Sequence, residues 1–404
     1  MRTARKQRRT PWTAGAYCTM LAALVLSAVP AAPPRRPYTD DSPWNLPIGR
    51  NPVYDRHSEE LVASLSGAFG CDPTQYAYTV YDAAAPVPVQ LSGVYSDVTD
   101  EGTRLAIRKR LAVMAPLPPS AVASSGRDAQ IVVVDPASGD EWGFWRFARS
   151  PEGVLTARNG YHYNIRWCGV PPIGFNSRGA GVPYLAGLVR PAEIRRARIE
   201  HALAFGCVRP SALFVFPATK SDGTGAFPAL PEGARLQLDP ALTDRDFDEW
   251  GLDGTGKTIA RALQEYGMVL VDGSGHTKIY VEDDHTARWG DLLHADTVKP
   301  IPYSAFRVLS LTAPARPDPP DALRAVGGGD GVLLTWEPSN AATRYRVSQR
   351  MNGDDAFTTV DPWVVEPRFL DRGADVGTPQ EYSVQAVSYN GVSERATVRF
   401  GPAD

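Results

Sequence analysis

Residues 190–219 read RPAEIRRARIEHALAFGCVRPSALFVFPAT, and this stretch decides the fold expected for the middle of the chain. Pro191 has the fixed φ angle that suits a first helical position, so a short basic helix is expected from there to about residue 197. From residue 199 onward, apolar side chains alternate with small or charged ones, which is the two-residue period of a β-strand. A second apolar run, 212–217, follows a Val-Arg-Pro-Ser turn, and the two runs are expected to pair at the centre of a sheet.

Short strands separated by turns that contain glycine and proline continue on both sides of this stretch. The runs IVVVD (131–135) and WGFWRFA (142–148) flank such a turn and predict a hairpin. Asn159-Gly160 separates two further runs, and this dipeptide is the strongest two-residue hairpin signal. The convincing later helical pattern covers 257–266. The sequence therefore predicts a mainly β fold, a large β-sandwich or jelly-roll-like domain with few helices.

The first 31 residues are organised like a secretory signal. Five Lys and Arg side chains in the first nine positions are followed by an uncharged stretch that lasts until Arg35 and contains the apolar run 20–29. Cleavage near Ala31 would leave 37 Lys and Arg against 45 Asp and Glu, a formal net charge of −8. The alternative is an uncleaved anchor on the outer face of a membrane, since the uncharged stretch approaches the length of a membrane span. We expect a secreted protein, with membrane contact only through an uncleaved signal.

Charge and cysteine content exclude several classes of function. A mildly acidic secreted body has no electrostatic reason to bind nucleic acid or anionic lipid. The cysteines that remain after cleavage are Cys71, Cys168 and Cys207, whose spacing fits no zinc motif. An oxidising compartment permits one disulfide among them and leaves one thiol over. No metal and no other cofactor is expected.

Two Pro-rich stretches divide the chain. Residues 32–50, behind the signal at 1–31, are expected to form an extended spacer. A second run, around 314–320, separates a β-rich main domain over 51–312 from a C-terminal domain over 313–404.

The C-terminal domain contains three rows of apolar side chains that point to one side of their strands. The rows consist of Val332, Leu334 and Trp336, of Tyr345 and Val347, and of Tyr382, Val384 and Ala386. With the prolines at its entry and the Asn390-Gly391 turn, this part resembles a fibronectin type III domain over residues 316–402. The resemblance implies an immunoglobulin-like β-sandwich with Trp336 at the centre of a two-sheet core and Tyr382 at the tyrosine corner of the family. Such modules accompany secreted enzymes that act on polymers, so a spacer or binding accessory is also implied.

Two nucleotide-like patterns occur, but their context argues against a nucleotide. The segment GLDGTGKT (251–258) satisfies the phosphate-loop pattern, which must follow a buried hydrophobic strand, whereas residues 243–250 are rich in charge. We expect its glycines to form a loop and Thr255 or Thr258 to cap the following helix. Met268–Asp272, followed by glycine, is likewise typical of a magnesium-binding strand end, but loop and strand are in the wrong order for a parallel nucleotide fold.

Two groups of proton-handling residues are candidates for catalysis. Glu200 and His201 point to opposite faces of the expected central strand, and a buried His201 would be a neutral base. Asp140 and Glu141 begin one strand and Glu282 ends another, and two carboxylates that face each other across a groove are what glycoside hydrolysis requires. The structural alternatives are a core histidine with one hydrogen bond and solvated acidic turns.

Aromatic side chains on two neighbouring hairpins are candidates for stacking on sugar rings. They are Trp142, Trp145, Tyr163 and Trp167, and alternation along the strands is expected to bury half of the aromatic residues in this region. We therefore expect a secreted protein that acts on an extracellular polysaccharide or a cell-envelope glycan, as a glycoside hydrolase or a polysaccharide lyase. The alternative is a non-catalytic adhesin or envelope-binding protein, which would present an aromatic patch without convergent titratable groups.

Overall fold

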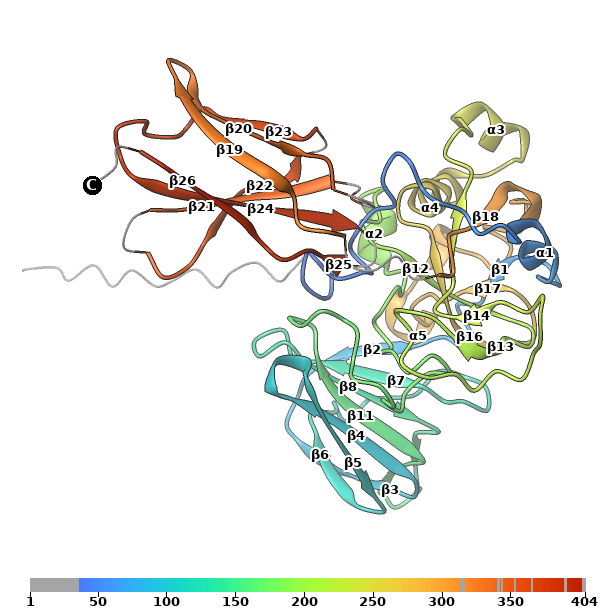
Figure 1. The fold of residues 1–404 in the computed structure, drawn as a ribbon. Helices are drawn as coiled ribbons and strands as arrows, with labels where there is room; N and C mark the ends of the chain where they lie inside the picture. The colour runs from blue at the N-terminus through green and yellow to red at the C-terminus, as the bar shows by residue number, and fades with distance from the viewer. Residues whose placement is uncertain are drawn as a thin grey trace, which may run out of the picture. The chain divides into compact units, whose positions relative to one another are not determined.

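The computed structural model describes residues 36–312, 317–339, 342, 344–351, 354–364, 366–388 and 391–401, so the expected signal at 1–31 lies outside the described residues. The mainly β class predicted from the sequence is confirmed, since strands outnumber the short helices throughout (Figure 1). Within the described ranges, no helix is long and apolar enough to cross a membrane.

A β-sandwich occupies residues 79–164. A six-stranded sheet of order β2-β7-β8-β11-β4-β5 packs on a four-stranded sheet of order β6-β3-β10-β9, and a buried cluster that includes Val89, Ile131 and Phe144 fills the space between them. The elements are β2 (Thr79–Asp82), β3 (Val87–Leu91), β4 (Val94–Thr99), η1 (Asp100–Gly102), β5 (Arg104–Lys109), β6 (Ala112–Ala115), β7 (Ile131–Val134), β8 (Asp140–Trp145), β9 (Ala148–Arg149), β10 (Leu155–Ala157) and β11 (Asn159–Asn164).

One of the two predicted hairpins in the sandwich is confirmed and the other is wrong. Strands β7 and β8 pair in antiparallel register across the predicted turn. Asn159-Gly160, in contrast, begins β11, and the chain changes sheets there because β10 pairs with β3 and β9. The dipeptide instead packs closely against neighbouring strands. The Asn159 side chain accepts a hydrogen bond from Val94 N at 3.0 Å. Gly160 lies so close to the Phe144 ring that a Cβ on it would be 2.7 Å from that ring.

A second, mixed sheet has the order β1-β17-β12-β16-β15-β18. Its centre is the parallel pair β12 and β16, so the predicted pairing of the runs after residue 199 and over 212–217 is wrong. The second run instead forms β13, which pairs with β14 in a separate ribbon. The strands are β1 (Gly70–Cys71), β12 (Leu203–Cys207), β13 (Ser211–Phe214), β14 (Pro231–Glu232), β15 (Arg235–Leu238), β16 (Met268–Gly273), β17 (Lys278–Ile279) and β18 (Phe306–Val308).

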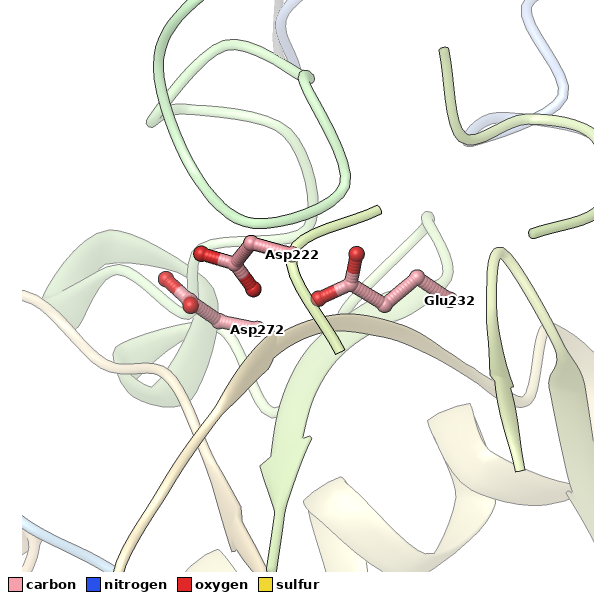
Figure 2. Close-up of side chains that lie close together, drawn as sticks. All are labelled: Asp222, Glu232 and Asp272. Carbon is pink, nitrogen blue, oxygen red and sulfur yellow. The ribbon is translucent and has the colours of Figure 1, made fainter. Parts of the chain in front are cut away.

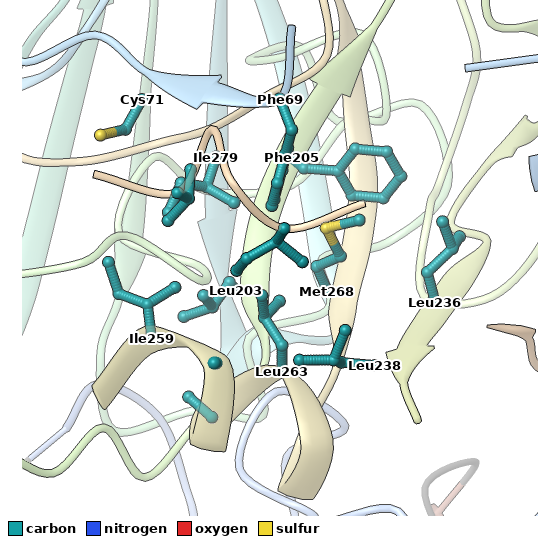
Figure 3. Packing of buried hydrophobic residues seen from close by; sticks show 14 of the residues in the cluster. Phe69, Cys71, Leu203, Phe205, Leu236, Leu238, Ile259, Leu263, Met268 and Ile279 are labelled. Carbon is teal, nitrogen blue, oxygen red and sulfur yellow. The ribbon is translucent and has the colours of Figure 1, made fainter. Parts of the chain in front are cut away.

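Helix α4 (Gly254–Glu265) packs its apolar side on the mixed sheet. Ile259 and Leu263 are fully buried against a cluster that includes Leu203 and Met268 (Figure 3), and each such side chain contributes about 1.5–3 kcal/mol by leaving water. The remaining helical elements are α1 (Ser58–Ala63), α2 (Pro191–Arg195), α3 (Asp244–Glu249), α5 (Asp284–Ala287), η2 (Gly290–Leu292) and η3 (Tyr303–Ala305).

The phosphate-loop-like segment forms the start of α4. Asp253 caps this helix by accepting a hydrogen bond from Gly256 N at 2.6 Å, so the predicted threonine cap is wrong. The Lys257 ammonium pairs with Asp248. The segment therefore forms a capped helix start whose lysine is paired with a carboxylate.

The described part of the expected spacer, residues 36–50, is packed rather than extended over solvent. Trp44 is 1% exposed and donates its ring N–H to the Gly169 carbonyl at 3.0 Å, while Leu46 and Ile48 are also buried. These side chains join the cores of the main body, so this segment belongs to the folded domain.

The C-terminal module is fibronectin type III-like. The predicted rows of apolar side chains form its core, in which the rings of Trp336 and Tyr345 lie 5.0 Å apart, and Tyr382 donates its hydroxyl to Asp371 at 2.8 Å. Asn390 of the expected turn lies outside the described residues. One sheet contains β19 (Asp321–Gly328), β20 (Gly331–Glu337) and β23 (Arg368–Asp371), and the other contains β21 (Arg344–Met351), β22 (Thr358–Val364), β24 (Gln380–Ser388), β25 (Gly391–Val392) and β26 (Ala396–Phe400).

Candidate functional site

Three carboxylates from separate segments converge beside the mixed sheet, and we call them the carboxylate cluster. They belong to Asp222, Glu232 and Asp272, and one oxygen of each lies within 4.8 Å of the others (Figure 2). Asp222 is exposed, Asp272 is half-buried and Glu232 is fully buried. The cluster can therefore be reached from solvent on the Asp222 side.

The parallel pair β12 and β16 positions the cluster. Asp272 lies near the carboxyl end of β16, opposite Gly206 of β12, and the carboxyl ends of parallel strands are the usual location of ligand sites in sheets. Glu232 is brought alongside by β14, since Gly233 N donates to the Leu270 carbonyl of β16 at 2.8 Å.

A loop over 174–182 closes one side of the cluster. It is fixed by two backbone hydrogen bonds, from Ala180 N to the Val271 carbonyl at 2.9 Å and from Thr219 N to the Ala180 carbonyl at 2.8 Å. The same bonds place the end of β16 beside the segment that carries Asp222. Gly179 faces the carboxylates, and a Cβ there would lie 2.3 Å from Glu232 Oε1, the nearest of the three.

Like charge is crowded in the cluster. Burial, and then the charges of Asp222 and Asp272, raise the pKa of Glu232 to about 8. Burial, and then the charge of Asp222, raise the pKa of Asp272 to about 7. In the part of the chain that the structure describes, no Lys, Arg or His forms an ion pair with any of the three. The repulsion among the carboxylates is thus left without a direct counter-charge.

Two cations lie behind the cluster but are bound elsewhere. Arg178 is 2% exposed, donates to the Tyr78 hydroxyl at 3.1 Å and to the carbonyls of Tyr184 and Ala186, and lies over tyrosine rings. Lys220 donates to the carbonyls of Arg178 and Gly179, each at 2.7 Å. Both hold the loop in place, and their charges only partly offset those of the carboxylates.

Further proton-handling and aromatic groups adjoin Asp272. Lys278 is 4% exposed and its ammonium lies 5.3 Å from the centre of the Tyr280 ring, and burial lowers the pKa of this lysine. Asp128 lies close enough for its charge to raise the pKa of Asp272, and it accepts a hydrogen bond from the half-buried Trp145 ring at 3.0 Å. Trp145, a sequence-predicted substrate-binding residue, is linked to this charge only through its hydrogen bond to Asp128.

Glu141, a predicted catalytic residue, is part of a buried hydrogen-bond network. It is 0% exposed and accepts hydrogen bonds from the hydroxyls of Tyr161 and Tyr38, at 2.6 and 3.1 Å, and from Leu185 N at 3.2 Å. With three donors and no access to solvent, this carboxylate ties the sandwich to the segment that contains Leu185.

His201 and Glu282 are linked in a second buried network around the start of α2. His201 Nε2 lies 2.9 Å from Glu193, whose other oxygen accepts a hydrogen bond from Arg190 N, and the Arg190 guanidinium pairs with Glu282. Burial alone would lower the pKa of His201, but the Glu193 carboxylate reverses this and the net pKa is raised, opposite to the direction that burial alone led us to expect. Glu200 lies at the surface, 3.9 Å from the Arg198 guanidinium.

Asp140 lies at the rim of the sandwich, away from these networks. It accepts hydrogen bonds from His162 at 3.0 Å and Asn164 at 2.9 Å, and His162 also contacts Asp97 at 3.2 Å. The half-buried Trp142 and Trp167 rings lie 5.4 and 6.5 Å from the His162 ring. We call Trp142, His162 and Trp167 the rim aromatics. Tyr163, the fourth predicted substrate-binding residue, is fully buried.

The predicted catalytic residues are thus distributed over several places, and the structure joins only His201 and Glu282 through shared partners. Sequence reasoning missed Asp222 and Glu232 and noted Asp272 only as a strand end. Asp222 lies in Ser-Asp-Gly and Glu232 in Pro-Glu-Gly, which both look like ordinary solvated turns. The sequence signal for this site was the Asp272-Gly273 dipeptide at the end of the buried apolar run that forms β16.

The three described cysteines are all free thiols. Cys71 and Cys207 are buried, and Cys168 is exposed. Burial raises the pKa of Cys71 and of Cys207 to about 12, so both are unreactive neutral thiols. The single disulfide that an oxidising compartment permits is not formed.

The known proteins that resemble this chain match only a part of it. No family model and no curated protein matches this chain. An Fn3-like protein from Clostridium thermocellum is 26% identical, with a TM-score of 0.20, and the match covers 22% of this chain and 98% of that one. The fn3 domain of human collagen alpha-1(XX) is 29% identical, with a TM-score of 0.19, and the match covers 23% of this chain and 94% of that one. Neither solved structure bears on the carboxylate cluster.

Proposed function

We propose that the protein is a secreted enzyme that cleaves an extracellular polysaccharide, and that cleavage takes place at the carboxylate cluster. The observation that supports this most is the convergence of Asp222, Glu232 and Asp272 within 4.8 Å on a side open to solvent. Trp145 donates a hydrogen bond to Asp128, whose charge acts on Asp272, and we propose this ring as the aromatic group that contacts the sugar. Aromatic faces stack on the apolar surface of sugar rings, and carboxylates bind sugar hydroxyls.

Two cleavage reactions fit these groups. Hydrolysis of a glycosidic bond uses two carboxyl groups, which in retaining enzymes are about 5–5.5 Å apart, close to the spacing in the cluster. Elimination instead needs a base and a positive charge near the sugar carboxylate, and we propose the buried Lys278, whose charge interacts with that of Asp272, for the positive charge. The two reactions give different products, so one assay separates them.

The test is incubation of the mature protein with a panel of cell-wall and plant polysaccharides, with detection of new reducing ends and of unsaturated products. Reducing ends alone identify a hydrolase, and both together identify a lyase. Asp272→Asn and Glu232→Gln are each expected to lower the rate about 100-fold, the size of effect that positioned proton-transfer groups have. Glu200→Gln, which removes a surface carboxylate distant from the cluster in sequence and contacts, is the matched control and should keep the full rate.

The proposal fails if no polymer of the panel is cleaved, or if Asp272→Asn and Glu232→Gln both cleave at the rate of the unchanged protein. Circular dichroism and thermal unfolding of each variant show whether a loss of rate reflects loss of the fold.

A second candidate function is non-catalytic glycan binding, and the rim aromatics favour it. Trp142 and Trp167 flank His162 with two carboxylates beside it, a combination that suits sugar rings and their hydroxyls. Under this proposal the polysaccharide is retained without new reducing ends, and Trp142→Ala together with Trp167→Ala removes retention. In either case the C-terminal module, which we propose to be a true fibronectin type III domain, is a spacer or binding accessory.

A further inference from the structure

We propose that the carboxylate cluster is a binding site for one divalent cation that prefers oxygen ligands, such as Ca²⁺. The inference rests on the proposed function for the place of the sugar, and in the cation-bound protein the three carboxylates act as ligands rather than as proton donors; cation binding itself is measured independently of any cleavage.

The donor set suits a hard cation. Asp222, Glu232 and Asp272 offer only carboxylate oxygens, with no sulfur or imidazole nitrogen among them. Carboxylate oxygens are the ligands of Ca²⁺, Mg²⁺ and Mn²⁺, whereas softer metals select cysteine and histidine. The three ligands come from the loop after β13, from β14 and from β16, so the fold assembles the set and no local motif announces it.

Glu232 provides evidence for a bound cation that a cluster of acidic residues would not provide by itself. Its side chain is 0% exposed and points into the cluster, and among the residues that the structure describes neither of its carboxylate oxygens has a hydrogen-bond partner. The adjacent Ser221 hydroxyl donates to the Ser211 carbonyl at 3.0 Å, so its hydrogen is used elsewhere. A buried carboxyl group without a hydrogen-bond partner is costly, because neither water nor protein replaces its hydration. A bound cation supplies the missing partner.

Gly179 packs closely against the three carboxylates. A Cβ on this residue would lie 2.3 Å from Glu232 Oε1, 2.7 Å from Asp222 Oδ1 and 3.0 Å from Asp272 Oδ1. One oxygen of each carboxylate therefore surrounds the space that a methyl group would fill. The three oxygens therefore face the same side of residue 179, and a side chain there would push them apart.

The cation also has room for further ligands. Ca²⁺ takes about six to eight oxygens at about 2.3–2.6 Å, and three carboxylates provide at most six of them. The carbonyls of Arg178 and Gly179 each accept a hydrogen bond from Lys220, which holds the loop beside the carboxylates. Water or oxygen atoms of the sugar complete the shell on the exposed Asp222 side. This arrangement ties substrate binding to the cation.

The test is titration of the mature protein, after treatment with a chelator, with Ca²⁺ by calorimetry and with Tb³⁺ by sensitised luminescence. One ion per chain is expected. Asp272→Asn and Glu232→Gln are each expected to weaken binding at least 10-fold. Gly179→Ala keeps all three carboxylates but places a methyl among them, and it is expected to abolish binding. Gly275→Ala is the matched control, since a Cβ there meets nothing within 4 Å, and it should bind like the unchanged protein.

Absence of binding to the unchanged protein overturns the inference, and so does unchanged binding by both Gly179→Ala and Glu232→Gln. The cleavage assay, run with and without chelator, separates this inference from the proposed function. Cleavage without cation binding would support the proposed function and contradict the cation site. Cation binding without cleavage of any polymer would support the cation site and contradict the proposed function.

Discussion

Replacing Arg178 with methionine is expected to lower the free energy of unfolding by about 3–5 kcal/mol. The guanidinium is the donor to the Tyr78 hydroxyl and to the buried carbonyls of Tyr184 and Ala186, and methionine leaves all three acceptors without it. Each unsatisfied buried group costs about 1–3 kcal/mol, which outweighs the gain from removing a buried charge. Urea unfolding of the full chain measures the difference.

Arg178→Lys is the informative control for this prediction. Lysine keeps the positive charge and one or two of the donors but loses the planar fork, so a loss of about half the methionine effect is expected. A change below about 1 kcal/mol in Arg178→Met would mean that the loop over 174–182 is held by its backbone alone, against the role assigned to the guanidinium.

Glu232→Gln is expected to stabilise the protein at high pH when no divalent cation is present. The pKa of Glu232 is raised in the folded protein from 4.5 to about 8, so the native state binds a proton that the unfolded state releases. The resulting stability is fully present below pH 4.5 and is lost as the pH rises to 8, a loss of about 5 kcal/mol. Glutamine does not ionise and avoids this loss.

The measurement is urea unfolding in chelator at pH 5 and pH 8.5. The variant and the unchanged protein should have similar stability at pH 5, and the variant should be more stable at pH 8.5. Glu249→Gln, at the exposed end of α3, is the matched control and should follow the unchanged protein at both values. Equal stability of Glu232→Gln and the unchanged protein at pH 8.5 would show that Glu232 bears no cost from its buried position.

Local patterns predicted the local parts of the fold. The β7–β8 hairpin, helix α2 with Pro191 in its first turn, and helix α4 each depend on residues that are close in the sequence. The parallel pairing of β12 with β16 joins residues more than 60 positions apart, and alternation cannot specify which distant strand is the partner. Asn159-Gly160 misled for a related reason: tertiary packing against Phe144 and β4 outweighed its turn preference.

The candidate site was predictable to the same extent: features that are local in the sequence could be predicted, and contacts between distant segments could not. Sequence reasoning selected carboxylates and rings that stand close together in the chain, such as Glu141 and Trp142, and the fold uses Glu141 to hold its own core. The carboxylate cluster joins three segments that only the fold brings together. Nothing in the Pro-Glu-Gly sequence announces that Glu232 is buried, because burial there results from β14 lying beside β16.

The central claim is that Asp222, Glu232 and Asp272 form one ligand-binding centre, and anomalous diffraction from crystals soaked in Mn²⁺ tests it most directly. The account predicts one strong peak with an oxygen of each of the three carboxylates in its coordination shell. A structure in which the three carboxylates stay apart, or in which Mn²⁺ binds elsewhere and leaves them without a peak, would contradict it.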